Sequence, residues 1–141
     1  MKVLLDTCVL SEVRRPDADA NVWAFMDAIP ADDLYISVLT VGEITKGIER
    51  LPDGKKKVKL TAWIGTLQRV FKNHIVGVDI QTAEIWGRIT ARSEEIGVQL
   101  PAVDGLLAAT AIQHDFKIAT RNVKHFRQTS AGLLDPWQSA G

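Results

Sequence analysis

The stretch Pro101–Ile112 reads PAVDGLLAATAI, and it is apolar on almost every side. A helix of this composition is buried all round rather than lying on a surface. Yet Asp104 places a carboxylate in its first turn. A buried ionised carboxylate is costly unless it is paired or binds a metal, although a negative charge near a helix N-terminus gains about 0.3–1 kcal/mol from the helix dipole. Both a structural role and a metal role are therefore open for this residue.

The composition is that of a globular protein. The chain has 141 residues, of which 46% are hydrophobic and 24% charged, and 17 basic residues balance 17 acidic ones. Its length predicts a single domain over residues 1–141, and its zero net charge means that any attraction for nucleic acid must be local. Cys8, the single cysteine, is typical of a reducing cytosol. No apolar run reaches the ~18–20 residues of a membrane span, and no signal-peptide core is found, so we expect a cytoplasmic protein without a membrane partner.

Short apolar segments alternate with helical patterns along the chain. Strands are expected at residues 2–5, 34–37, 74–78, 117–120 and, as a last edge strand, 132–134. Helices are expected at residues 7–15, 19–29, 39–51, 55–72, 80–96 and 101–112, with a loop or short turn at 121–126. This alternation predicts an α/β fold, with helices on both faces of a mostly parallel central sheet of four to five strands.

Ligands of such folds bind at the carboxyl ends of the strands, so polar residues that follow a strand are candidates. Asp6 follows the first strand, Glu43 lies in the helix after the second, and Asn122 follows the fourth. Structural alternatives exist: Asp6 can cap the next helix, and Thr40 with Glu43 matches a capping box. Asp79 also follows a strand, and we interpret it as an N-cap.

Three carboxylates at one sheet edge, those of Asp6, Glu43 and Asp104, would repel one another. Two unit charges about 4 Å apart cost about 4 kcal/mol at an effective dielectric constant of 20, so three pairs approach about 12 kcal/mol. The stability of a whole domain is only about 5–15 kcal/mol. Such a cluster needs protonated members or a divalent cation, and oxygen ligands suit Mg²⁺ or Mn²⁺. The three histidines are far apart, so no zinc pattern is present.

Four segments resemble the PIN-domain ribonucleases. They read LLDT at 4–7, ISVLTVGEI at 36–44, DGLLAATA at 104–111 and TRNVKHF at 120–126, and the resemblance continues to LLDPW at 133–137. The branch indicated is that of the VapC toxins of bacterial toxin–antitoxin pairs, which includes FitB. The resemblance implies a PIN-like three-layer α/β/α sandwich and an acid cluster that binds Mg²⁺ or Mn²⁺, here Asp6, Glu43 and Asp104. Many PIN domains have an aspartate where this chain has Asn122, so we expect one firm metal site.

The activity implied by this resemblance is that of a Mg²⁺-dependent endoribonuclease. Such a toxin hydrolyses RNA phosphodiester bonds and inhibits translation and growth until its antitoxin neutralises it. The catalytic residues would be Asp6, Glu43, Asp104 and Asn122, with Asp6 and Asp104 holding the metal and Glu43 binding it directly or through water. The resemblance further implies a VapB-type antitoxin, a homodimer, toxin–antitoxin hetero-oligomers, and contact with promoter DNA only through the antitoxin.

Several further residues have weaker assignments. Arg121 and Lys124 could contact RNA phosphates, and Thr7 or Thr120 could hydrogen-bond the carboxylates. The run KKKVK at 55–59 is interpreted as a solvated helix face, with RNA or partner contact as its alternative. The four tryptophans are expected at mostly core positions rather than as platforms for bases.

Several other functions compete with that of a nuclease. A phosphatase that uses Asp6 as a covalent nucleophile usually needs a second acid two residues later, where this chain has Cys8. Dinucleotide-binding and P-loop proteins require glycine patterns that are missing here. The main alternative is a catalytically weak or inactive PIN-fold module that binds RNA or a partner, and Asn122 is its best support.

Overall fold

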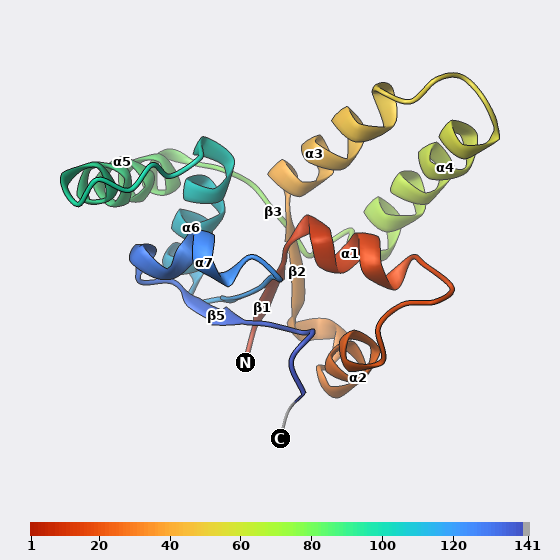
Figure 1. The fold of residues 1–141 in the computed structure, drawn as a ribbon, viewed down its shortest axis with the longest axis horizontal. Helices are drawn as coiled ribbons and strands as arrows, with labels where there is room; N and C mark the ends of the chain where they lie inside the picture. The colour runs from red at the N-terminus through yellow and green to blue at the C-terminus, as the bar shows by residue number, and fades with distance from the viewer. Residues whose placement is uncertain (140–141) are drawn as a thin grey trace.

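Five short strands form one parallel sheet in the computed structural model, which describes residues 1–139. The strand order is β3-β2-β1-β4-β5, and every neighbouring pair is parallel (Figure 1). The strands are β1 (Val3–Leu5), β2 (Leu34–Ser37), β3 (Ile75–Val76), β4 (Lys117–Ala119) and β5 (Gly132–Leu134). The predicted parallel α/β fold is confirmed, with β3 shorter than expected because only two of its residues pair with β2.

Helices connect the strands and flank the sheet. They are α1 (Thr7–Val13), α2 (Ala20–Ala28), α3 (Val38–Glu49), α4 (Lys55–Val70), α5 (Ile80–Glu95), α6 (Ala102–His114) and α7 (Val123–Phe126), with 3-10 turns at Ala31–Asp33 and Arg127–Thr129. The segment 121–126 thus contains a short helix rather than only a loop. The capping box that was the structural alternative for Thr40 and Glu43 does not form, because Ser37 caps α3 by accepting a hydrogen bond from the backbone N–H of Leu39 at 3.0 Å.

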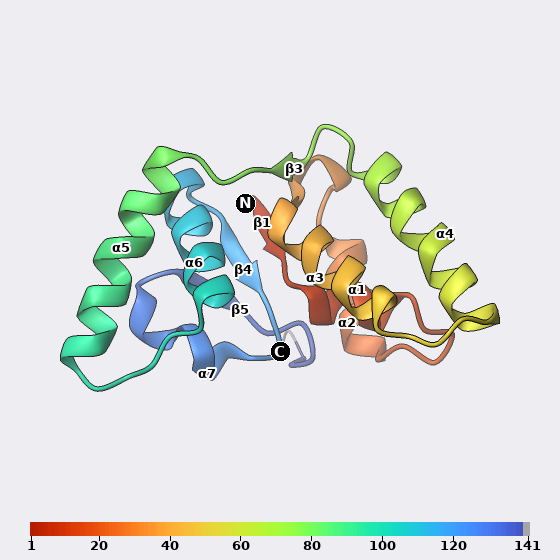
Figure 2. The ribbon, with the colours of Figure 1, turned by 90° about the horizontal axis from the view of Figure 1, so that it is seen from above.

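Two hydrophobic cores lie on opposite faces of the sheet. Side chains alternate along β1: Val3 and Leu5 belong to the core covered by α1–α4, whereas Leu4 belongs to the core covered by α5 and α6. Figure 2 shows these two groups of helices on either side of the strands. This arrangement is the three-layer α/β/α sandwich. Successive side chains of a strand point to opposite faces of the sheet, and in this sheet both sets are apolar, so helices cover both faces.

The apolar stretch from the sequence forms α6, which packs closely on α5. Its residues Gly105, Leu107 and Ala108–Ala111 are buried, whereas Ile112 is 38% exposed, so burial is extensive without being complete. A Cβ atom added to Gly105 would lie 2.9 Å from the indole Cδ1 of Trp86. The glycine therefore permits the close approach of the two helices, and this packing places the first turn of α6.

The remaining predictions about structural residues are largely confirmed. Asp79 caps α5 by accepting from the N–H of Thr82, which also lowers the pKa of the Asp79 carboxyl. Trp63, Trp86 and Trp137 pack against the cores, as expected. Trp23 does not, since it is 46% exposed on α2. No helix within residues 1–139 has the length and apolar character of a membrane span.

Candidate metal site

The order of the strands reverses at the carboxyl ends of β1 and β4. The chain runs outward from β1 to β2 and β3 and then returns to β4 on the other side of β1. Connections on the two sides leave toward opposite faces, and ligands of open parallel sheets bind at such a switch point. Asp6 follows β1 here, and its backbone N–H donates to the carbonyl of Ala119 at 3.0 Å. The two strand ends are thereby joined beside the carboxylate.

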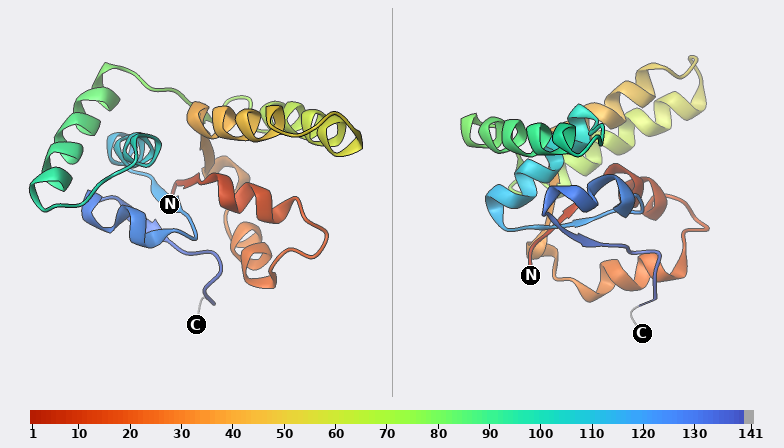
Figure 3. Two further views of the ribbon diagram at one scale, coloured as in Figure 1. Left: turned by 45° about the horizontal axis from the view of Figure 1, so that its top comes forward. Right: turned by 60° about the vertical axis from the view of Figure 1, so that its left-hand side comes forward.

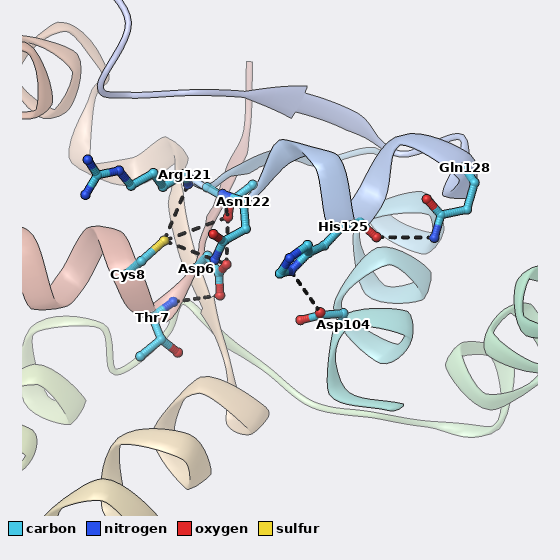
Figure 4. Close-up of polar contacts among 9 residues, drawn as sticks. Asp6, Thr7, Cys8, Asp104, Arg121, Asn122, His125 and Gln128 are labelled. Carbon is cyan, nitrogen blue, oxygen red and sulfur yellow. Dashed lines mark hydrogen bonds and ion pairs between the residues drawn. The ribbon is translucent and has the colours of Figure 1, made fainter. Parts of the chain in front are cut away.

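The Asp6 carboxylate is held on both of its oxygens. Its Oδ1 accepts from the N–H of Thr7 at 2.8 Å, and its Oδ2 accepts from the Thr120 hydroxyl at 2.8 Å (Figure 4). The residue is 8% exposed and caps α1, so the expected structural role exists beside any chemical one. Both threonines that were candidates for carboxylate contacts make them, and the carboxylate has little freedom to turn.

Cys8 lies against the same carboxylate. Its Sγ is 3.8 Å from Asp6 Oδ2 and 3.8 Å from the Thr120 hydroxyl, and it accepts from the N–H of Arg121 at 3.5 Å. Burial raises the pKa of the Cys8 thiol, and the neighbouring Asp6 charge adds to this rise. A neutral thiol is the form that can donate weakly to the carboxylate. The sequence analysis did not predict the contacts of Cys8 with Asp6 and Thr120, because no spacing pattern in the sequence indicates them.

Glu43 approaches the cluster from α3. Its Oε1 accepts from the Thr7 hydroxyl at 3.0 Å. Loss of hydration raises the pKa of the Glu43 carboxyl, the charges of Asp6 and Asp104 raise it further, and the Thr7 hydrogen bond opposes them. Glu43 is exposed, and a Cβ atom added to Gly47, one turn later on α3, would meet nothing within 4 Å. The Glu43 carboxyl is therefore close enough to Asp6 and Asp104 for both charges to act on it.

Asp104 lies in the first turn of α6. Burial raises the pKa of its carboxyl, the charge of Asp6 raises it further, and His125 lowers it. The Nδ1 atom of His125 is 3.6 Å from Asp104 Oδ2, and the histidine side chain is 57% exposed. Figure 4 shows this pair set apart from the Asp6 cluster. Sequence reasoning missed His125, although it lies in the TRNVKHF segment.

The structure brings the three carboxylates to one edge but not to one point. Among residues 1–139, no three His, Cys, Asp or Glu side chains are spaced as a metal centre. Their repulsion is therefore smaller than the ~12 kcal/mol expected at 4 Å separations. The donors still fit a Mg²⁺-type ion, because they are carboxylates and because the ionised forms of two of them are disfavoured without a cation. Coordination would require Glu43 and Asp104 to turn toward Asp6.

The loop after β4 carries the remaining predicted site residues. Asn122 donates its backbone N–H to the Thr120 hydroxyl at 3.0 Å, and its side chain lies beside Asp6 (Figure 4). The Arg121 guanidinium lies 5.1 Å from the ring centroid of Trp137 and points away from Asp104. Lys124 lines a separate hollow of about 260 Å³ together with His125. Asn122 is thus in the cluster, whereas Arg121 and Lys124 lie at its margins.

A parallel α/β domain with carboxylates at its switch point is the arrangement of a PIN domain, and the comparison with protein families agrees. The model of the PIN domain matches residues 3–131, and the chain belongs to this family. It is 35% identical over 136 residues to the toxin FitB of Neisseria gonorrhoeae, covering 96% of this chain and 98% of that protein. It is 29% identical to the VapC ribonuclease Y4jK of Sinorhizobium fredii, covering 98% and 99% of the two chains.

Solved structures place the chain in the same group. FitAcB from Neisseria gonorrhoeae matches with a TM-score of 0.90 and 34% identity, covering 96% of this chain and 99% of that one. A structure of FitAB bound to an IR36 DNA fragment matches with a TM-score of 0.91, also at 34% identity, covering 99% and 98%. The chain is therefore a PIN domain of the FitB and VapC group, as the sequence motifs indicated.

Proposed function

We propose that this chain is the toxin of a toxin–antitoxin pair and acts as a metal-dependent endoribonuclease. The observation that carries the proposal is that Asp6, Glu43 and Asp104 share the edge of the sheet at the switch point, with the pKa values of Glu43 and Asp104 raised in part by the charge of Asp6. Carboxylates arranged in this way gain most from a divalent cation. Relatives named as VapC ribonucleases support RNA as the substrate.

The chain's own residues would prepare the site for hydrolysis. A bound Mg²⁺ or Mn²⁺ ion supplies Lewis-acid chemistry, by lowering the pKa of water and offsetting charge on a phosphate. Asp6, fixed by Thr7 and Thr120, is a ligand already in position, and Asp104 and Glu43 complete the set. The Asn122 amide lies beside Asp6, where it can orient a water or a phosphate oxygen. Fixed donors of this kind need little reorganisation during the reaction.

The proposed partners follow from the assemblies of the relatives. FitAB and VapBC structures pair such a toxin with an antitoxin, some of them are bound to DNA, and in one the DNA is a fragment of the promoter. We therefore propose a VapB-type antitoxin, a homodimer and toxin–antitoxin hetero-oligomers, with promoter DNA reached only through the antitoxin. The proposed substrate is RNA whose cleavage inhibits translation and growth, and the proposed place of action is the cytoplasm.

Cleavage of total RNA by the purified chain tests the nuclease function. We expect new 5′ ends in Mg²⁺ or Mn²⁺, none with EDTA, and none with Asp104→Asn. RNA binding without cleavage in either metal would instead support the inactive binding module. Asn122 is the observation that favours this alternative, so an Asn122→Asp variant belongs in the same series. Restored cleavage only in that variant would show that the natural chain lacks a metal ligand.

A further inference from the structure

Two adjoining hollows lead away from the acidic edge along α1. The first, of about 200 Å³, is lined by Thr7, Glu43, Arg14 and Trp63 and otherwise mainly by apolar side chains, those of Ile44, Ile48 and Leu60. The second, of about 980 Å³, is lined by Arg14, Gly54, Lys55, Lys56, Val58 and Lys59, and we call it the basic groove. Because Arg14 lines both hollows, they adjoin at this residue. Both views of Figure 3 show α1, in red, running below the α3–α4 pair.

Arg14 lies where the first hollow adjoins the basic groove. It follows α1 directly, seven residues after Thr7, which corresponds to two helical turns or about 10 Å. Its guanidinium lies 5.7 Å from the ring centroid of Trp63 on α4. This contact between a cation and an aromatic face directs the charge toward α4 rather than into open solvent. The arginine is thereby placed between the acids and the lysines.

The lysines of the groove are free to bind an anion. Within residues 1–139, the ammonium groups of Lys55, Lys56 and Lys59 form no hydrogen bond or ion pair, and the lining holds no acid. Lys57 differs, because its Nζ lies 3.3 Å from the carbonyl of Leu51 and 3.8 Å from Asp53. The KKKVK run is therefore divided into one structural lysine and three that surround the groove.

We propose that the basic groove binds the phosphate backbone of the RNA strand on one side of the cleaved bond, an inference that rests on the ribonuclease function proposed above. A strand whose phosphate lies at the Glu43 edge and continues along the first hollow reaches Arg14 and then the lysines. The chain as a whole has zero net charge, so this is a local concentration of positive charge. Flexible lysines act as point charges, and they hold a single strand without reading its sequence.

The salt dependence of RNA binding tests this assignment. The probe is a single-stranded oligoribonucleotide of about 16 nucleotides, titrated in EDTA so that no cleavage occurs. The variant Lys55→Ala with Lys56→Ala and Lys59→Ala removes three phosphate contacts. At about 0.7 per contact, the slope of log K against log salt should fall by about 2. The groove residues are exposed, so circular dichroism should show an unchanged fold.

A matched triple variant controls for net charge. Lys72→Ala with Arg88→Ala and Arg92→Ala also removes three exposed cations, from outside the groove, and should leave the slope unchanged. Equal slopes for the two variants would overturn the proposal. An unchanged RNA slope with lost antitoxin binding would assign the groove to a protein partner and overturn it too. The expected fall in slope without RNA cleavage in Mg²⁺ would uphold the groove while rejecting the nuclease function.

Discussion

Asp6 and Asp104 lie close enough for the charge of Asp6 to raise the pKa of Asp104, yet the two carboxylates are held in different ways. Asp6 is fastened on both oxygens, by a backbone N–H and by the Thr120 hydroxyl, at 2.8 Å each. Among residues 1–139, Asp104 pairs with His125 alone, at 3.6 Å, and owes its place to the packing of α6. Hydrogen bonding secures one acid and helix burial secures the other.

This difference predicts how substitution of each carboxylate should affect stability. A hydrogen-bonded carboxylate contributes to stability, and its removal leaves donors without partners. A carboxylate that is partly dehydrated and repelled by a neighbour costs stability in its ionised form. Asp6 should therefore contribute to both stability and function. Asp104 should be needed for function, while its ionised form lowers the free energy of unfolding.

The largest expected effect comes from two substitutions of Asp6. Asp6→Ala should lower the free energy of unfolding by about 1–3 kcal/mol, because it removes the cap of α1 and the acceptor of Thr120. Asp6→Asn keeps a capping oxygen and should be close to the parent in stability. Both should reduce RNA cleavage at least about 100-fold, because the charge is lost. Urea unfolding in EDTA and initial cleavage rates measure the two effects, and a stable, active Asp6→Ala would refute this role.

The packing that places Asp104 can be disturbed without touching the carboxylate. Gly105→Ala adds a Cβ that would lie 2.9 Å from Trp86 and 3.2 Å from Leu100, and should cost about 1–3 kcal/mol and reduce cleavage. The control is Gly87→Ala in α5, where a Cβ meets nothing within 4 Å. It should stabilise by about 0.5–1 kcal/mol and leave cleavage unchanged. Thermal unfolding distinguishes them, and equal effects would contradict the packing argument.

The raised pKa values predict how stability depends on pH without a cation. The native state binds protons at Glu43 and Asp104 more tightly than the unfolded state does. Their contribution is therefore most favourable below the ordinary carboxyl pKa, about 4, and becomes unfavourable as pH rises through the raised values. The double variant Glu43→Gln with Asp104→Asn should gain stability relative to the parent over that rise. A difference between the two proteins that is independent of pH would contradict the prediction.

The smallest effect is expected at His125. Its contact with Asp104 is long and exposed, so His125→Ala should change the free energy of unfolding by less than about 0.5 kcal/mol. Because His125 lowers the pKa of Asp104, the variant should raise that pKa further. Carbon-detected NMR titration of the Asp104 carboxyl measures this shift. A fall in the pKa would show that the two side chains do not interact as the structure indicates.

The spacing of apolar residues was sufficient to predict the fold. The rule that ligands bind at the carboxyl ends of parallel strands was sufficient to place the acids at one edge of the sheet. Alternating apolar segments predicted the parallel sheet, and the strand ends selected Asp6. Sequence could not choose between Ser37 and Thr40 as the cap of α3, because that depends on where β2 stops pairing. It could not show how far apart the acids lie, which tertiary packing decides. His125 was missed for the same reason, since its contact with Asp104 joins α7 to α6.

The Asp104→Asn variant tests the central claim most directly, when cleavage and metal-free stability are measured on the same preparation. The substitution removes a charge that Asp6 repels while keeping nearly the same shape. We predict that cleavage of RNA in Mg²⁺ or Mn²⁺ is lost, whereas the free energy of unfolding in EDTA at neutral pH is equal to or higher than that of the parent. Retained cleavage together with lower metal-free stability would show that Asp104 is structural and would contradict this account.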